Sequence, residues 1–167
     1  MVKFSILIGL TLGLILINAG LTLGDAGDLE CNKYVAQVTV HNVAVGLGEM
    51  LKNHEGEESR IELIRSFVDP IRFFPDDSGY FFVYYYNHVN IALPPQPELE
   101  GEDLSDYTDR NGKFVIRELS QVAKDGGGFV EYYWAKPGEE GDHKKISYVE
   151  PIPNSEYFIG TGVYMSE

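Results

Sequence analysis

The hydrophobic positions of the C-terminal third gather in three short runs, which polar, turn-forming clusters separate. The runs cover residues 129–134, 146–150 and 157–164 and are rich in aromatic and β-branched residues, the composition of β-strands. The clusters between them carry the Pro, Gly, Asn and Asp that tight turns need. Because parallel strands require crossovers of about a dozen residues or more, these short connections predict an antiparallel meander.

The densest aromatic stretch, residues 80–86 (YFFVYYY), predicts a further strand with both faces covered. Side chains on a strand alternate between its two faces. The set expected to share one face is Tyr80, Phe82, Tyr84 and Tyr86. A shorter strand is expected over residues 89–93, and the prolines within residues 94–97 are expected to end regular structure.

Apolar residues at three- and four-residue steps predict helices over residues 31–54, 59–67 and 114–124. Gly46 and Gly48 lower the helix propensity of the first. The predicted order is helix, helix, strand, strand, helix and three strands, with neither a repeat nor a linker. Residues 31–167 are therefore interpreted as one domain.

The N-terminal segment is a targeting signal. Residues 4–24 are predominantly apolar, and Lys3 is the only charge before Asp25. A run of this length can span a bilayer as a helix, while small residues near its end suit signal cleavage. Residues 1–25 are thus predicted to be a signal peptide or a signal-anchor transmembrane helix. The remainder is expected to be exported, as a secreted or periplasmic domain or as one anchored outside the cell membrane.

Charge and residue content narrow the range of functions. The 167 residues carry a formal net charge of −13, which argues against a nucleic-acid partner because phosphate binding needs a basic surface. The one cysteine, Cys31, cannot form an internal disulfide, and the four histidines lack metal-ligand or catalytic spacing. We expect no catalytic residue, no metal and no cofactor.

One segment nearly matches a calcium-binding loop. Asp109, Asn111, Gly112 and Glu118 occupy positions 3, 5, 6 and 12 of an EF-hand register. Position 1 would be Tyr107, which cannot supply the first carboxylate. We therefore interpret the segment as a turn.

Five segments together resemble the single Cache domain, the PAS-like extracytoplasmic sensor module of chemoreceptors and histidine kinases. They are SGYFFVY (78–84), PELEGEDLSDYTDRNGK (97–113), GGGFVEYYW (126–134), KISYVE (145–150) and YFIGTGVY (157–164). The resemblance covers residues 34–164. It implies an α+β fold in which a long N-terminal helix packs on a five-stranded antiparallel sheet.

The resemblance also implies a ligand site on the concave face of that sheet. A small metabolite, typically an organic acid, would contact aromatic hydroxyls, a tryptophan and a basic residue there. The matching positions are Tyr80, Phe82 and Tyr84 on the first strand, Tyr132 and Trp134 on the third, and Lys145 opening the fourth. Many relatives carry a histidine where this chain has Leu93 before Pro94, so one polar contact is missing.

The residues themselves leave alternatives open. A lysine among aromatic side chains suits a carboxylate, but Lys145 is equally interpretable as a surface lysine and the tyrosines as core. The first hypothesis is a non-enzymatic sensor of a small metabolite without its own output domain, since the chain ends soon after the last strand. It would act alone, as a homodimer through the helix of residues 34–51, through a separate signalling partner, or as part of a receptor. The second is an interaction module with a collapsed pocket; the third is a hydrolase without a recognisable motif.

Overall fold

The computed structural model describes residues 23–165, which form three helices, one short 3₁₀ helix and five strands. The elements are α1 (Leu23–Leu51), α2 (Glu57–Val68), β1 (Phe82–Tyr85), β2 (Asn90–Ala92), η1 (Pro97–Leu99), α3 (Val115–Lys124), β3 (Gly128–Ala135), β4 (Asp142–Pro151) and β5 (Tyr157–Tyr164). This order agrees with the predicted α+β order.

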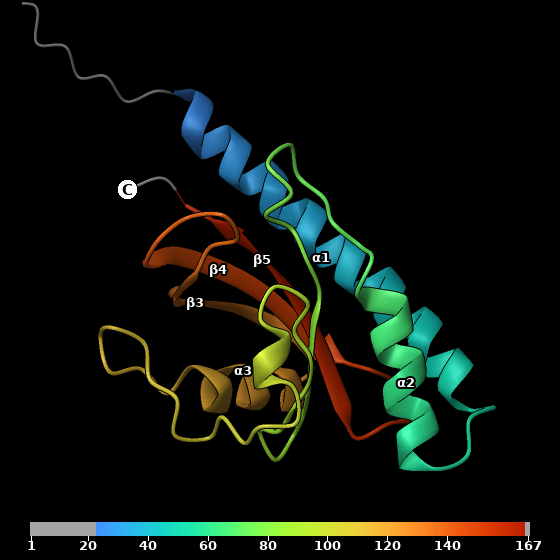
Figure 1. Cartoon of the computed structure of the whole chain (residues 1–167). Coiled ribbons are helices and arrows are strands. Elements are labelled where there is room, and N and C mark those ends of the chain that lie inside the picture. Colours follow the sequence, from blue (N-terminus) through green and yellow to red (C-terminus); the bar gives the residue numbers. More distant parts are fainter. Residues whose placement is uncertain (1–22, 166–167) are drawn as a thin grey trace, which may run out of the picture.

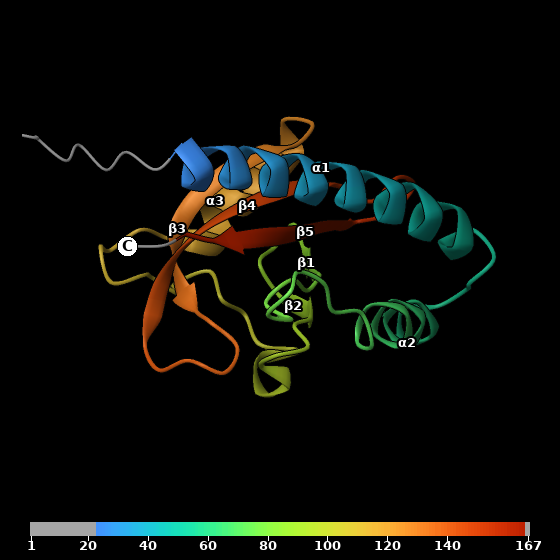
Figure 2. The ribbon, with the colours of Figure 1, turned by 90° about the horizontal axis from the view of Figure 1, so that it is seen from above.

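The strands form one antiparallel sheet in the order β2-β1-β5-β4-β3. The predicted meander is confirmed as β3-β4-β5, and β1 pairs with β5, which brings the two halves of the chain together. Long helix α1 lies along one face of the sheet, and α2 follows beside it (Figure 1, Figure 2). The PAS-like architecture expected from the sequence is therefore present.

Each face of the sheet has its own core, as the alternation within residues 80–86 predicts. Phe81 and Val83 pack with the buried side of α1, where Val40, Leu47 and Leu51 are fully buried. On the opposite face, the side chains that pack together from β1, from the residues just before it and from α3 are Tyr80, Phe82, Tyr84, Val115, Ile116 and Leu119. The aromatic segment of residues 80–86 therefore contributes buried side chains to both cores.

Several predicted boundaries are wrong. The first helix continues through both glycines to end at Leu51 rather than at residue 54, because one side of it, with Val40 and Leu47, is buried against the sheet. Strand β1 starts two residues later than expected. Strand β4 begins at Asp142 because its first residue pairs with Ala135 of β3, so Lys145 lies inside the strand and does not open it. The proline segment ends in η1.

The predicted targeting segment, residues 1–25, lies almost entirely outside the described residues. Helix α1 begins at Leu23, within the last residues of that segment. None of the helices within residues 23–165 has the length and hydropathy needed to cross a bilayer. Cys31 is exposed on α1.

Candidate ligand-binding site

A small cavity lies on the α3 side of the sheet. Its walls are Tyr80, Phe82, Tyr84, Leu93, Ile116, Tyr132, Trp134 and Lys145. The structure therefore brings together all six residues that the sequence predicted for the site, with Leu93 and Ile116 added. The cavity volume is about 10 Å³, which is barely enough for one water molecule. The walls contain no His, Ser, Asp or Glu, so the paired groups of a hydrolase are not found there.

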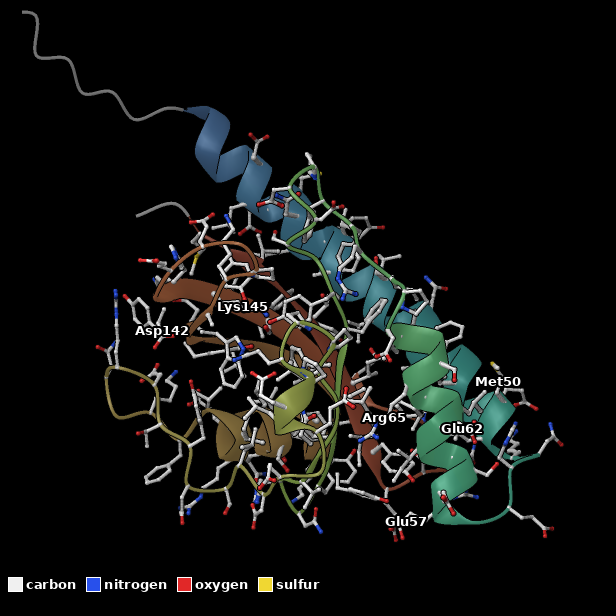
Figure 3. The ribbon with its side chains drawn as sticks, viewed as in Figure 1. Met50, Glu57, Glu62, Arg65, Asp142 and Lys145 are labelled. Atoms are coloured by element: carbon white, nitrogen blue, oxygen red, sulfur yellow. The ribbon has the colours of Figure 1, made fainter. Side chains whose placement is uncertain are left out.

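Lys145 is the one cationic side chain in the cavity wall and is only 1% exposed. Figure 3 labels it within the sheet. Its Nζ donates a hydrogen bond of 2.8 Å to the Tyr80 hydroxyl and lies 4.1 and 4.7 Å from the ring centroids of Tyr80 and Tyr164. Within residues 23–165 no carboxylate forms an ion pair with Lys145. Burial lowers the pKa of Lys145 well below its ordinary value.

Two features of the sheet direct Lys145 into the cavity. Its cross-strand neighbours are Tyr132 on β3 and Tyr164 on β5, so all three side chains share one face. On β5, Gly162 leaves the space through which the lysine stem passes, because a Cβ there would collide with Cε of Lys145 and Oγ of Ser147. A glycine inside a strand often marks such a close approach.

Three tyrosine hydroxyls on the lysine's side of the sheet form hydrogen bonds with their neighbours. The Tyr80 and Tyr164 hydroxyls are 3.2 Å apart, and the Tyr164 hydroxyl donates to the carbonyl of Ala135. The Tyr132 hydroxyl lies 2.8 Å from Oγ of Ser147. Burial raises the pKa of Tyr80 and Tyr132 well above the ordinary value, so both stay protonated and able to donate.

The segment between β2 and η1 closes the cavity. Trp134 donates from Nε1 to the side-chain oxygen of Gln96 at 2.8 Å. The Leu93 amide donates to Oε1 of Glu100 at 3.0 Å. The other oxygen of Glu100 lies 3.1 Å from Nε of Arg65 on α2, which is labelled in Figure 3. We name residues 93–100 the lid. The Leu93–Glu100 bond lies within this lid, while Gln96 and Glu100 connect it to β3 and α2.

Asn90 is a polar residue that the sequence analysis did not select. It is fully buried on β2 and pairs in register with Tyr84. Its amide lies close to the Tyr84 hydroxyl but makes no hydrogen bond of normal geometry within the described residues. Leaving such a group unpaired costs about 1–3 kcal/mol. The only sequence signal was an asparagine among apolar neighbours in a predicted strand.

The other missed contributors had weaker signals. Tyr164 and Ser147 share the cavity face with selected residues by two-residue spacing, which could have found them. Gln96 lies in a proline-rich segment without periodicity, so nothing marked it. The Gly160-Thr161-Gly162 segment belongs to β5 and shapes the cavity floor.

The near-match to a calcium loop has a structural role. The Asp109 carboxylate accepts hydrogen bonds from the backbone amides of Asn111, Lys113 and Tyr133 at 2.9, 3.0 and 3.1 Å. These bonds tie the turn to β3 and lower the pKa of Asp109, although burial opposes the shift. In the part of the chain that the structure describes, no cluster of three or more potential metal ligands occurs.

A larger hollow, of about 830 Å³, runs along α2. Its lining residues lie on that helix, among them Glu57, Glu62 and Arg65 (Figure 3), and at Asp69 directly after it. No second element encloses it, so it is an open helix surface. The small cavity, with its buried lysine, is the better candidate for a ligand site.

An antiparallel sheet with a long helix behind it and a small polar cavity in front is the architecture of a PAS-like sensor domain. The model of the Cache domain family matches residues 33–167, and the chain belongs to this family. The sequence is 31% identical over 150 residues to the methyl-accepting chemotaxis protein McpP of Pseudomonas putida, covering 84% of this chain. It is 42% identical over 89 residues, 53% of this chain, to the sensor histidine kinase MctS of Rhizobium johnstonii.

Solved structures agree with this assignment. A periplasmic sensor domain of a chemotaxis protein superposes with a TM-score of 0.73 at 28% identity, covering 83% of this chain and 98% of that one. A Cache chemosensory domain studied for carboxylic acid recognition gives a TM-score of 0.72 at 26% identity, with coverage of 84% and 98%. The chain spans only 27% of the chemotaxis protein and 19% of the kinase.

Proposed function

We propose that this domain is an exported, non-enzymatic sensor that binds a small organic acid in the cavity beneath the lid. The observation that carries the proposal is Lys145, a buried amine without a carboxylate partner in residues 23–165 and surrounded by hydroxyl donors. A ligand carboxylate would supply the acidic partner that Lys145 lacks. The likeness to a domain that recognises carboxylic acids supports this class of ligand.

The walls limit the shape and charge of that acid. One carboxylate would be held by Nζ of Lys145 and the hydroxyl of Tyr80. Phe82 offers only apolar contact, and the indole N–H of Trp134 already donates to Gln96. A second charge on the ligand would be buried without a partner, which is costly. We therefore propose a small, singly charged acid in preference to dicarboxylates and amino acids.

Ligand entry requires the cavity to expand, since about 10 Å³ holds no organic acid. We propose that the lid moves by breaking the Gln96–Trp134 hydrogen bond. The small volume also favours the second candidate function, an interaction module whose pocket stays closed. The two candidate functions differ in one measurable respect, because only a sensor would be stabilised against unfolding by a bound acid.

The signal would leave through α1 or through a separate partner. The outward side of α1 carries exposed apolar residues, among them Tyr34 at 67% exposure, Val38 and Val45. We propose this surface as the contact with a second copy of the domain or with a signalling partner. We further propose that residues 4–24 direct export, either as a cleaved signal peptide or as a helix that anchors the domain outside the cell membrane.

The test is a thermal-shift screen of the purified chain against short monocarboxylates, dicarboxylates and amino acids. A ligand at a hundredfold its dissociation constant stabilises the folded state by about 2.7 kcal/mol, which raises the melting temperature by several degrees. We expect the shift with monocarboxylates, and its loss in Lys145→Met. Lys144→Met is the matched control because its side chain lies on the same strand, is 42% exposed and pairs with Glu131. If no acid shifts the melting temperature, even after the protein has been unfolded and refolded to remove any bound metabolite, the result would support the interaction module.

A further inference from the structure

We propose that the cavity takes up its acid together with one proton, so that an uncharged empty site becomes a Lys145–carboxylate ion pair. This inference rests on the proposed function and adds what happens to charge at the same site. The reactants are an acid anion, the neutral amine of Lys145 and one proton, and the product is the anion bound to the Lys145 ammonium group. The proton is taken from solvent if the anion binds, or is brought by the ligand if the neutral acid binds.

The surroundings of Lys145 carry this inference. The titratable groups that face it are the hydroxyls of Tyr80 before β1, Tyr84 on β1, Tyr132 on β3 and Tyr164 on β5. Ile116 of α3 and Leu93 of the lid contribute only apolar surface. From outside the wall, Arg72 acts on Tyr80, Asp142 on Tyr164, and Tyr107 on Tyr84 and Tyr132.

An ammonium group in this setting has no adequate compensation. It would have one hydroxyl bond of 2.8 Å and the faces of aromatic rings, while burying an unpaired charge is among the most costly changes in a protein interior. The amine therefore loses its proton in the empty domain, in line with the lowered pKa that burial gives it. The tyrosines cannot return the proton, because burial raises their pKa values.

A bound carboxylate reverses this balance. An opposite charge within hydrogen-bonding distance favours the ammonium form, and the tyrosine hydroxyls can donate to the remaining carboxylate lone pairs. Binding is therefore linked to protonation, and the apparent affinity for the anion should fall about tenfold for each unit of pH at which the free amine is neutral. An acid sensor of this kind responds to acid concentration and to pH together.

Isothermal titration calorimetry of the full chain with propionate tests the inference. Titrations at about pH 8 in buffers with different ionisation enthalpies give the number of protons bound, from the slope of the observed enthalpy against the buffer enthalpy. We expect about one proton taken up per propionate, and a dissociation constant about tenfold weaker at one pH unit higher. Binding with a slope of zero and no pH dependence would overturn proton uptake while leaving the sensor function intact.

The failure of the proposed function gives a different result, namely no heat of binding with any short acid in any buffer. Lys144→Met serves as the control and should keep both the affinity and the slope, because its ammonium group pairs with Glu131 at the surface. Lys145→Arg gives a second measurement, since arginine stays charged at all relevant pH values. If this variant folds and binds, its slope should be close to zero; uptake of one proton by it would contradict the assignment to Lys145.

Discussion

The two faces of the sheet are built from the same strands but serve different purposes. Against α1, the packed residues are apolar and fully buried, as Leu47, Val83 and Ile159 show. Against α3 and the lid, tyrosines, a tryptophan and a lysine point into a small cavity, and an asparagine amide stays unpaired. The first face is a continuous apolar core, whereas the second buries polar groups at a cost in stability.

The largest expected effect is on the α1 face. Leu47→Ala removes a fully buried side chain and should lower the free energy of unfolding by about 2–5 kcal/mol. Urea denaturation measures this loss. Affinity for an acid, measured where the variant remains folded, should stay within a factor of two or so because the cavity is on the other face. A large loss of affinity would mean that the two faces are not separate.

Gly162→Ala tests the space that β5 leaves for the lysine. The added methyl group collides with the Lys145 stem and with Ser147, and overpacking of this kind costs about 1–3 kcal/mol. We expect lower stability together with weaker acid binding. Gly46→Ala is the matched control because it is a helical glycine with open space around its Cα, so it should be neutral or slightly stabilising. Equal behaviour of both variants would contradict the role of Gly162.

The pH dependence of stability should distinguish Lys145 from its neighbour. The pKa of Lys145 is well below 10.5 in the folded chain and has its ordinary value of 10.5 in the unfolded chain. At pH values between these two pKa values, Lys145 carries a proton in the unfolded chain but not in the folded chain. In that window the free energy of unfolding rises with pH, by at most about 1.4 kcal/mol per unit. Denaturation of Lys145→Met should lack this rise, and Lys144→Met should keep it. Parallel curves for all three proteins would show that Lys145 is charged when buried.

The smallest expected effect concerns the lid. Gln96→Leu removes the acceptor for Nε1 of Trp134, which should cost about 1 kcal/mol and change the rates of acid association and dissociation in stopped-flow measurements. Gln121→Leu, an exposed change on α3 that loses only contacts to Asp125, is its control. Unchanged rates in Gln96→Leu would mean that the Trp134 contact does not hold the lid.

Much of this molecule could be predicted from local pattern. Two-residue alternation assigns Tyr80, Phe82 and Tyr84 to one face and Phe81 to the other, because a strand allows only two directions for its side chains. The selected Lys145 and Trp134 follow the same rule on their strands. The resemblance to Cache domains added how the strands combine, which alternation alone does not specify.

The remainder depends on contacts between distant segments. The lid is held by the pairs Gln96–Trp134 and Arg65–Glu100, whose members lie far apart in the chain, and no periodicity marks such pairs. The burial of Lys145 follows from the space at Gly162. The cavity volume depends on how side chains from β1, β3, β4, α3 and the lid fill one space, which no single segment determines.

Strands β4 and β5 are shared by the cavity and by the helix behind the sheet. Lys145 and Tyr164 face the cavity, while the residues next to them in the chain, Ile146 and Val163, pack with Ala36 of α1. A single peptide bond therefore separates Lys145, which lines the cavity, from Ile146, which contacts the long helix. Under the proposed function, a backbone shift at Lys145 that accommodates an acid would also move Ile146 against Ala36 of α1.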